Sequence, residues 1–412
     1  MHSTEIVVIG GGAAGIAAVR HLHQAGRACV LLDARDRLGG RGWTINAGGQ
    51  TIDLGCGWLH SADRNPWTKI AQTQGREIDR SLAPWQRPAT GFDMTQAEFK
   101  MYRHALGDFY ARLSDAARHQ PDRPASELLD SGGRWNALIR SVIGYISGAD
   151  VERLSVRDFE NYEDNEVNWR VVEGYGTTIV AHAEGVDVIL NCPVTRIDHG
   201  GKRLRIETAQ GSVEAEKAIV TLPTDVIAGM HDLFSPALPE KIDAAAGLPL
   251  GLADKLFLSL AHAEEFEPDT RVFGRTDAVT GTYSLRSFGR PLIECYFGAG
   301  LAADLERGGK KAFVAHAVHE LTARMGSAFA KRLDFLALHC WRADPFAGGS
   351  YSFALPGQEG KRTVLAAPVD GRLFFAGEAC SVNDYSTAHG AYRTGELAAE
   401  AILRIFEKLG AA

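Results

Sequence analysis

The sequence predicts an α/β protein in which a doubly wound domain is interrupted in the chain by a second, mixed α+β domain. Three observations support this fold class. A strand, a glycine-rich turn and a helix occupy residues 5–26, and strands of similar pattern return over residues 186–222. Between them, residues 81–171 carry apolar side chains at helical spacing. The length of 412 residues accommodates two or three domains.

The composition is that of an ordinary globular protein and argues against several classes of partner. Hydrophobic residues make up 45% of the chain and charged residues 23%. The net charge of −7 gives no overall attraction to nucleic acid or to an anionic membrane surface. No apolar run reaches the roughly 18 residues of a membrane span. The first apolar segment follows Glu5 rather than a basic residue, which argues against a secretion signal.

The cysteines are scattered, with no CxxC spacing that would indicate a metal site or a redox pair. They are Cys29, Cys56, Cys192, Cys295, Cys340 and Cys380. We therefore expect reduced thiols, no bound metal and a cytoplasmic location.

The first motif with a chemical meaning begins at residue 5. An apolar strand leads into Gly10-x-Gly12-x-x-Gly15 and a helix, and a second strand ends in Asp33. Gly10 permits the tight turn, Gly12 allows the backbone to approach a pyrophosphate, and Gly15 allows the helix to pack on the sheet. Asp33 can accept hydrogen bonds from a ribose diol, and the helix N-terminus can bind phosphates. The order of these parts predicts a Rossmann-like dinucleotide site.

Arg35 and the loop Gly39-Gly40-Arg41 follow the acid directly. They form either a surface turn or a second contact with phosphate oxygens. Here the chain resembles the flavin-containing amine oxidases, whose fingerprint has an acid, an Ala-Arg pair and a Gly-Gly-Arg in this order. These relatives usually carry glutamate in place of Asp33. The resemblance implies FAD as the cofactor.

Further motifs extend the resemblance along nearly the whole chain. The segment TIDLGCGWLHSADRNP, residues 51–66, is similar to the family segment that passes beside the flavin ring, and its Trp58-x-His60 spacing is similar to that of polyamine oxidases. The later motif WRADP, followed by GSY, is similar to the polyamine oxidase and histone demethylase branches. Monoamine oxidases have a flavin-linked cysteine where this chain has Ser350, so the resemblance implies a non-covalent FAD.

A strand predicted within GLADKLFLSL, residues 251–260, carries a lysine among apolar residues. By strand alternation Lys255 shares a face with Phe257, whereas the leucines take the other face. The lysine is either solvated or hydrogen-bonded inside a cavity. Amine oxidases carry a lysine at this place that contacts flavin N5 through a water, so the resemblance favours the second interpretation.

The resemblance also implies the other residues of the site. Tyr351 would flank the substrate nitrogen, Thr387 replaces the second tyrosine of monoamine oxidases, and His60 would either face the flavin cavity or be structural. The implied catalytic residues are Lys255, Tyr351, His60 and Thr387. The implied cofactor-binding residues are Gly10, Gly12, Ala14, Gly15, Asp33, Arg35, Gly40, Arg41, Gly57, Trp58, Val194, Trp341, Glu378, Thr387 and Ala388.

The family pattern divides the chain into two discontinuous domains. The FAD-binding domain is expected over residues 1–80, 172–245 and 355–412, and the substrate-binding domain over the helical insertion 81–171 and residues 246–354. Apolar and aromatic residues at helical spacing in the insertion are expected to form core. Five acids near its end form either a solvated face or an entrance that attracts cationic amines. These acids are Asp158, Glu160, Glu163, Asp164 and Glu166.

The resemblance implies oxidation of an amine by hydride transfer to flavin N5, hydrolysis of the imine to an aldehyde or ketone, and reduction of O2 to hydrogen peroxide. The alternative is an FAD-dependent carbon–carbon desaturase or a porphyrinogen oxidase-like enzyme, because such relatives share the FAD fingerprint. A flavin-bearing interaction protein is disfavoured, since the sequence has no long coiled-coil insertion or basic arm. The expected partners are a small amine and O2, without nucleic acid or membrane. The sequence leaves a homodimer open and identifies neither the amine nor the electron acceptor.

Overall fold

The apolar strand β2 (Ile6–Ile9) lies at the centre of a five-stranded sheet in the computed structural model, which describes residues 2–410. The strand order is β19-β12-β2-β3-β8, and every neighbouring pair is parallel. The other four strands are β19 (Leu373–Phe375), β12 (Lys217–Val220), β3 (Cys29–Leu32) and β8 (Val188–Ile189). The sheet therefore takes strands from three distant parts of the chain, which confirms the prediction of a discontinuous α/β domain.

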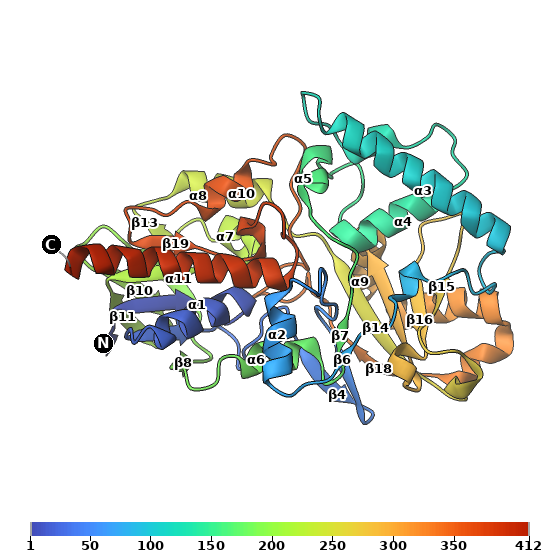
Figure 1. Ribbon diagram of the computed structural model, residues 1–412, viewed down its shortest axis with the longest axis horizontal. Helices are drawn as coiled ribbons and strands as arrows, with labels where there is room; N and C mark the ends of the chain where they lie inside the picture. Colours follow the sequence, from blue (N-terminus) through green and yellow to red (C-terminus); the bar gives the residue numbers. More distant parts are fainter. Residues whose placement is uncertain (1, 411–412) are drawn as a thin grey trace.

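Strand alternation explains the layers on the two faces of this sheet. Ile6 and Val8 pack against two helices, α1 (Ala13–Gln24) and α11 (Ala388–Gly410), which lie side by side in Figure 1. Val7 and Ile9 pack on the opposite face, against an antiparallel meander and helices. The meander consists of β9 (Val194–Asp198), β10 (Leu204–Thr208) and β11 (Gly211–Ala215), extended by β1 (His2–Ser3) and β13 (Phe234–Ser235). The helices on this face are α7 (Thr224–Gly229), α8 (Pro239–Gly247) and α10 (Lys361–Ala366).

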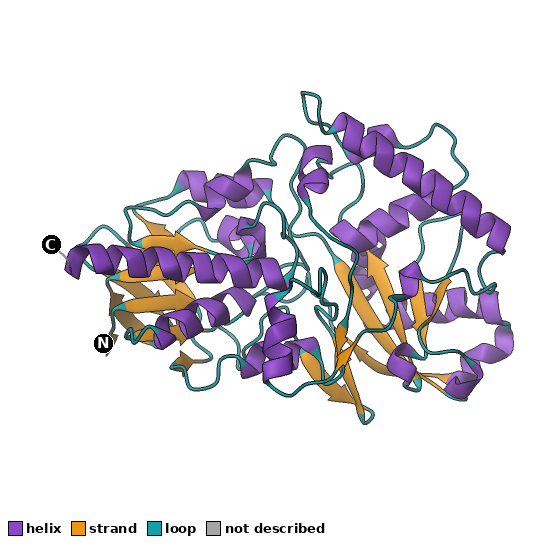
Figure 2. Cartoon of the chain, viewed as in Figure 1, coloured by secondary structure: helices purple, strands orange, loops and turns teal. Residues whose placement is uncertain are grey.

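A third five-stranded sheet occupies the other half of the molecule, on the right in Figures 1 and 2. Its order is β15-β16-β17-β14-β18, and all neighbours are antiparallel. The strands are β15 (Thr270–Phe273), β16 (Thr282–Leu285), β17 (Leu292–Gly298), β14 (Ala253–Leu260) and β18 (Leu333–Leu338). Leu256 and Leu258 share a core with helix α9 (Ala299–Met325). Phe257 instead packs with residues of the hairpin β4 (Thr44–Ala47) and β5 (Gln50–Asp53), so the predicted division of faces is confirmed.

The predicted helical insertion is present as α3 (Gln96–Ala116), α4 (Asn136–Ser147) and α5 (Val156–Asn161). A capping box of Thr95 and Glu98 begins α3. The apolar stripe is core, as predicted: its buried members are Tyr102, Leu106, Phe109 and Leu113, while Phe99 and Tyr110 are partly buried against the same cluster.

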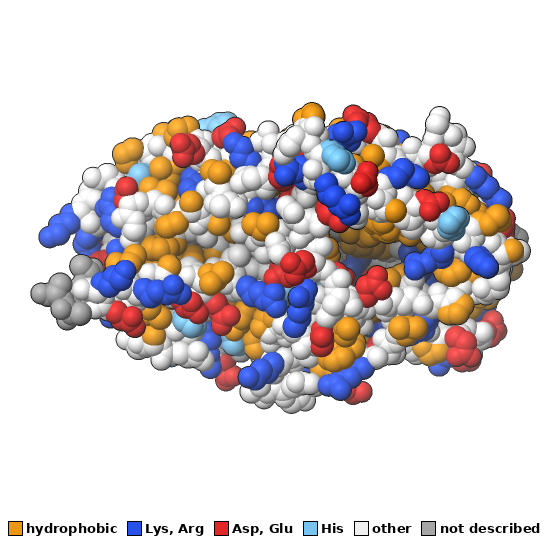
Figure 3. Space-filling view, turned by 45° about the horizontal axis from the view of Figure 1, so that its top comes forward, with side chains coloured by type: hydrophobic (Ala, Val, Ile, Leu, Met, Phe, Trp, Pro, Cys, Tyr) orange, Lys and Arg blue, Asp and Glu red, His pale blue; other side chains and the backbone are white. Residues whose placement is uncertain are grey.

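Short elements lie between the parallel sheet and the antiparallel sheet that contains β14 in Figure 1. They are α2 (Pro66–Thr73), α6 (Tyr175–Ala181), β6 (Ile78–Asp79) and β7 (Arg170–Val171). None of the helices within residues 2–410 is long and apolar enough to cross a membrane. Figure 3 shows acidic and basic side chains interspersed over one face of the molecule.

The acidic stretch at the end of the insertion is only partly a solvated face. Glu160, Glu163 and Asp164 are exposed, but Asp158 is fully buried. Its carboxylate accepts from Nε of Arg362 at 2.6 Å and from Nη2 at 2.7 Å. The interpretation of Asp158 as a solvated or steering charge was therefore wrong, because its partner lies on a distant helix that the local pattern does not reveal.

Candidate active site

The glycine-rich turn before α1 has the geometry of a phosphate-binding loop. Gly10 has φ of 106°, and a Cβ there would lie 2.6 Å from Oγ1 of Thr221. A Cβ at Gly15 would lie 1.8 Å from the Gly10 carbonyl oxygen. By contrast, no atom lies within 4 Å of a Cβ built at Gly12, the N-cap of α1, and no side chain caps this helix. Open backbone at an uncapped helix N-terminus fits the phosphates of a dinucleotide.

Asp33 ends β3 beside this turn. Its Oδ2 accepts from the backbone N–H of Gly11 at 2.6 Å, and its Oδ1 accepts from that of Arg35 at 2.7 Å. Burial raises the pKa of Asp33. The backbone N–H of Cys192 donates to the Asp33 carbonyl at 2.8 Å, which brings the start of β9, and thus Val194, to the same edge. The ribose and adenine contacts assigned to Asp33 and Val194 stay predictions.

The loop that carries Arg41 lies against the glycine-rich turn, since a Cβ at Gly40 would be 3.1 Å from the Cα of Gly12. Nη1 of Arg41 donates to Oε1 of Glu378 at 2.9 Å and to the Ser350 carbonyl at 2.7 Å. Burial alone would raise the pKa of Glu378, but Arg41 and further hydrogen bonds outweigh burial and lower it. Arg41 and Glu378 line a small hollow at the carboxyl ends of β12 and β19, where α/β sheets bind ligands.

Two predicted cofactor residues have protein partners that the sequence did not indicate. Nη2 of Arg35 forms an ion pair with Asp344 at 2.8 Å, and Asp344 also lies 3.1 Å from Nε2 of His339. Trp341 is buried in the core between the antiparallel sheet that contains β14 and helix α9, and its Nε1 donates to the Leu54 carbonyl at 3.3 Å. Their contacts with a cofactor remain predictions.

Two predicted residues lie at the contact between the N-terminus of α11 and its neighbours. A Cβ at Gly395 would be 2.2 Å from the Ala14 carbonyl oxygen, so α1 and α11 pack closely at Ala14. The Ala388 carbonyl accepts from Nε1 of Trp67 at 2.9 Å.

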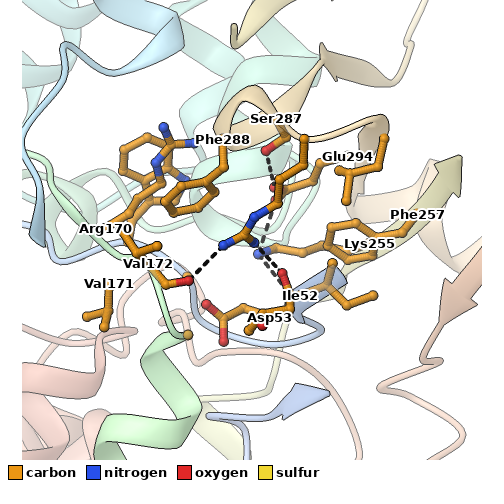
Figure 4. Close-up of a pocket in the computed structure, with 16 residues that line it drawn as sticks. Ile52, Asp53, Arg170, Val171, Val172, Lys255, Phe257, Ser287, Phe288 and Glu294 are labelled. Atoms are coloured by element: carbon orange, nitrogen blue, oxygen red, sulfur yellow. Dashed lines mark hydrogen bonds and ion pairs between the residues drawn. The ribbon is translucent and has the colours of Figure 1, made fainter. Parts of the chain in front are cut away.

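Lys255 is buried on the face of β14 that looks toward β5 (Figure 4). Its Nζ lies 3.1 Å from Oε1 of Glu294 and donates to the Asp53 carbonyl at 3.2 Å. Burial alone would lower the pKa of Lys255, but the carboxylates of Glu294 and Asp53 outweigh it and raise the pKa. The lysine lines a small cavity, partly open to solvent, together with Gly57 and Trp58. The solvated interpretation of Lys255 is thus wrong.

Gly57 leaves room for the lysine, because a Cβ at this position would be 3.1 Å from Nζ. The same segment reaches the Arg41 loop, since the backbone N–H of Cys56 donates to the Arg41 carbonyl at 3.2 Å. Residues 53–57 therefore connect the buried lysine with the loop beside the glycine-rich turn.

Tyr351 joins a group of three tyrosines next to the lysine. Its hydroxyl donates to the backbone carbonyl of Tyr145 and lies 3.0 Å from the hydroxyl of Tyr296. Tyr296 is the residue directly opposite Lys255 in the β14–β17 ladder. The structure thus brings Tyr351 and Lys255 together through Tyr296, and the hydrogen bond to Tyr145 fixes the Tyr351 ring.

His60 and Trp58 lie on one side of their segment, because both approach Trp85. The ring centroids are 6.5 Å and 4.5 Å from Trp85, respectively. Nδ1 of His60 lies 2.6 Å from Oδ1 of Asn168. Burial lowers the pKa of His60, which favours the neutral imidazole.

The Thr387 hydroxyl is already engaged at the N-terminus of α11. It donates to the Asp384 carbonyl at 2.6 Å and accepts from the backbone N–H of Gly390 at 2.9 Å. This is a helix cap, so the hydroxyl organises the helix end. A catalytic role for Thr387 stays a prediction.

Four residues of the site were missed by sequence reasoning: Tyr145, Asn168, Glu294 and Tyr296. The last two were detectable, because Glu294 and Tyr296 are alternate polar residues in the apolar strand LIECYFG and so share a face. Tyr145 and Asn168 contribute through contacts between distant segments and left no local pattern.

The family model described as flavin-containing amine oxidoreductase matches residues 13–141 and 141–403 of the chain. Rice (Oryza sativa subsp. japonica) polyamine oxidase 5 is 28% identical over 434 residues, covering 96% of this chain and 87% of that protein. Human (Homo sapiens) lysine-specific histone demethylase 2 is 24% identical to this chain. The aligned region covers 96% of this chain and 53% of the demethylase.

The solved structures of putrescine oxidase share the fold. The wild-type enzyme bound to putrescine superposes with a TM-score of 0.80 at 17% sequence identity, covering 98% of this chain and 99% of the other. A double mutant with redesigned cofactor binding gives a TM-score of 0.79 over the same coverage.

Proposed function

The chain belongs to the flavin-containing amine oxidoreductase family and is an FAD-dependent oxidoreductase acting on amines, and from this premise we propose that it oxidises a small aliphatic amine to an imine. One observation carries the proposal. A buried ammonium, Lys255, lines a cavity that residues 53–57 connect to the Arg41 loop, and Tyr296, directly opposite Lys255, lies 3.0 Å from the hydroxyl of the fixed Tyr351.

When bound, FAD supplies the acceptor for a hydride from the amine α-carbon and returns the electrons to O2 as hydrogen peroxide. The open backbone at Gly12 and the uncapped N-terminus of α1 would hold its phosphates. Asp33 would bind a ribose, and Arg41, with Glu378 as its partner, would bind a phosphate farther along the cofactor.

The remaining residues would orient the amine and control charge. Tyr351, whose hydroxyl is tied to Tyr145, would present its ring to the substrate nitrogen. Lys255 would hold a water and place positive charge where electron density arrives. His60 would remain neutral and orient substrate or water. A substrate that arrives as the free amine needs no strong base, and the imine it gives would be hydrolysed to an aldehyde or ketone.

The names of the relatives guide the choice of substrate. Proteins similar to this chain are called polyamine oxidases and putrescine oxidase, and we propose that di- or polyamines are its substrates. A panel of putrescine, spermidine, spermine and benzylamine, assayed for peroxide, tests this. Peroxide from one or more amines is expected. Turnover of a polyene or a porphyrinogen, with none from any amine, would instead support the desaturase or porphyrinogen oxidase alternative.

We predict that the FAD is released completely by acid. The Ser350 hydroxyl, in the place of the flavin-linked cysteine, donates to the Ala253 carbonyl and accepts from its N–H, both at 2.9 Å, and a hydroxyl cannot form a thioether. After acid precipitation, chromatography should find all the flavin as free FAD in the supernatant. Yellow colour in the washed pellet would contradict a dissociable cofactor.

A further inference from the structure

The carboxylate beside Lys255 has no role in the reaction as proposed above. Glu294 lies on β17, where Tyr296 is directly opposite Lys255 and Phe257 is directly opposite Glu294. Residues two apart on a strand share a face, so Glu294 is the diagonal neighbour of Lys255 on the cavity side. The side chain of Lys255 is 10% exposed and that of Glu294 is 23% exposed, so this ion pair is screened less than a surface pair.

The other charges around the ammonium are already engaged. The Asp53 carboxylate accepts from Oγ1 of Thr44 and from the backbone N–H of Tyr175, so only the Asp53 carbonyl contacts the lysine. Arg170, from β7, is paired with Asp79 and Asp269.

Arg290, which enters the cavity beside β17, donates to the backbone carbonyls of Thr51 and Val172. Ser287 is the other side-chain partner of Glu294, at 3.4 Å. Among the described residues, Glu294 is the carboxylate within ion-pair distance of Lys255 Nζ.

We propose that Glu294 is the positioning residue of Lys255, holding the ammonium at the cavity wall and keeping it protonated over the working pH range. The inference rests on the role given to Lys255 in the proposed function. An ammonium with two fixed contacts, to Glu294 and to the Asp53 carbonyl, is held in one orientation. Without this carboxylate, burial favours the neutral amine, and the more weakly attracting carboxylate of Asp53 is left to oppose it.

The sign of the pH effect follows from this balance. The role proposed for Lys255 requires the charged ammonium. Its pKa is raised in the protein, so the charge is lost only as the pH rises through that raised pKa. Glu294→Gln removes the negative charge and keeps the shape, which lowers the pKa of Lys255. Above the lowered pKa, the rate of the half-reaction that depends on Lys255 should fall about tenfold per pH unit.

The experiment compares the wild type with Glu294→Gln, Lys255→Met and the double variant, each as the FAD-loaded protein. Glu264→Gln is the matched control, because that side chain is 75% exposed and lies outside the cavity. The readouts are the pH profiles of anaerobic flavin reduction and of flavin reoxidation by O2, together with the midpoint potential of the bound flavin. The pH profile of Glu294→Gln should show a fall in rate at alkaline pH that the profiles of Glu264→Gln and of the double variant lack. At neutral pH its potential should shift to more positive values, because the uncompensated ammonium favours the reduced flavin.

A Glu294→Gln profile and potential equal to those of the wild type, with a slow Lys255→Met, would overturn this inference and leave the proposed function standing. Wild-type behaviour of Lys255→Met would overturn the role of the lysine and this inference together. If Glu294→Gln does not retain FAD, Glu294→Asp provides the test. Aspartate keeps the negative charge but holds it farther from Lys255, so the alkaline fall in rate should appear at a pH between those of the wild type and of a variant without the charge. An unshifted Glu294→Asp profile would then count against the proposal.

Discussion

Lys255→Met should slow flavin reduction by amine, flavin reoxidation by O2, or both, by about a hundredfold to a thousandfold. Methionine keeps the length and the apolar stem of lysine but removes the charge and the donors. The partner left behind, Glu294, is partly exposed to the cavity, so water can solvate it and the protein should still fold and bind FAD. Rapid mixing under anaerobic and aerobic conditions assigns the loss to one half-reaction.

Lys202→Met is the control for this prediction, because Lys202 is exposed in the turn between β9 and β10. It should leave both half-reactions at the wild-type rate. If Lys255→Met also kept both rates, with FAD bound and the amine saturating, the buried lysine would be structural only.

Arg362→Met should destabilise the protein by about 3–5 kcal/mol, which is the usual effect of leaving one partner of a buried ion pair alone. Arg362 and Asp158 are both fully buried, and the guanidinium also lies 3.8 Å from the ring centroid of Tyr385. The ion pair joins α5 of the helical insertion to α10, which packs on one face of the parallel sheet. Denaturant unfolding of the variant, compared with the wild type, measures the loss.

The matched control is Arg404→Met, which removes the exposed pair of Arg404 with Glu400 on α11 and should change stability by at most about 0.5 kcal/mol. Arg362→Met combined with Asp158→Leu should recover part of the loss, because an apolar pair leaves no buried charge unpaired. Equal stability of Arg362→Met and Arg404→Met would show that the buried pair contributes no more than a surface one.

The parts of the fold that depend on local sequence could be predicted. Strands β9 and β10 lie within residues 186–222, where strands were predicted, because apolar alternation and the intervening glycine turn define them locally. The strand, turn and helix at residues 6–24 were predicted for the same reason. Pairs such as Arg362 with Asp158 and Arg35 with Asp344 are 204 and 309 residues apart, and no local pattern encodes them.

In the candidate site, too, the features that depend on local sequence could be predicted, whereas contacts between distant segments could not. Period-two alternation correctly separated Lys255 from the leucines that pack on α9. Its partner Glu294 could not be assigned, because that requires the register between β14 and β17, which only the folded sheet provides. Thr387 shows what a motif alone does not reveal: the resemblance implied a residue of the site, and the structure shows that its hydroxyl caps the N-terminus of α11.

The most direct test of the central claim is anaerobic mixing of the FAD-loaded protein with each amine of the panel, followed by the visible absorbance of the flavin. At least one di- or polyamine should bleach the flavin completely and yield about one equivalent of aldehyde per flavin, and admission of O2 should restore the colour and release peroxide. A flavin that stays oxidised with every amine, although dithionite reduces it readily, would contradict amine oxidation by this protein.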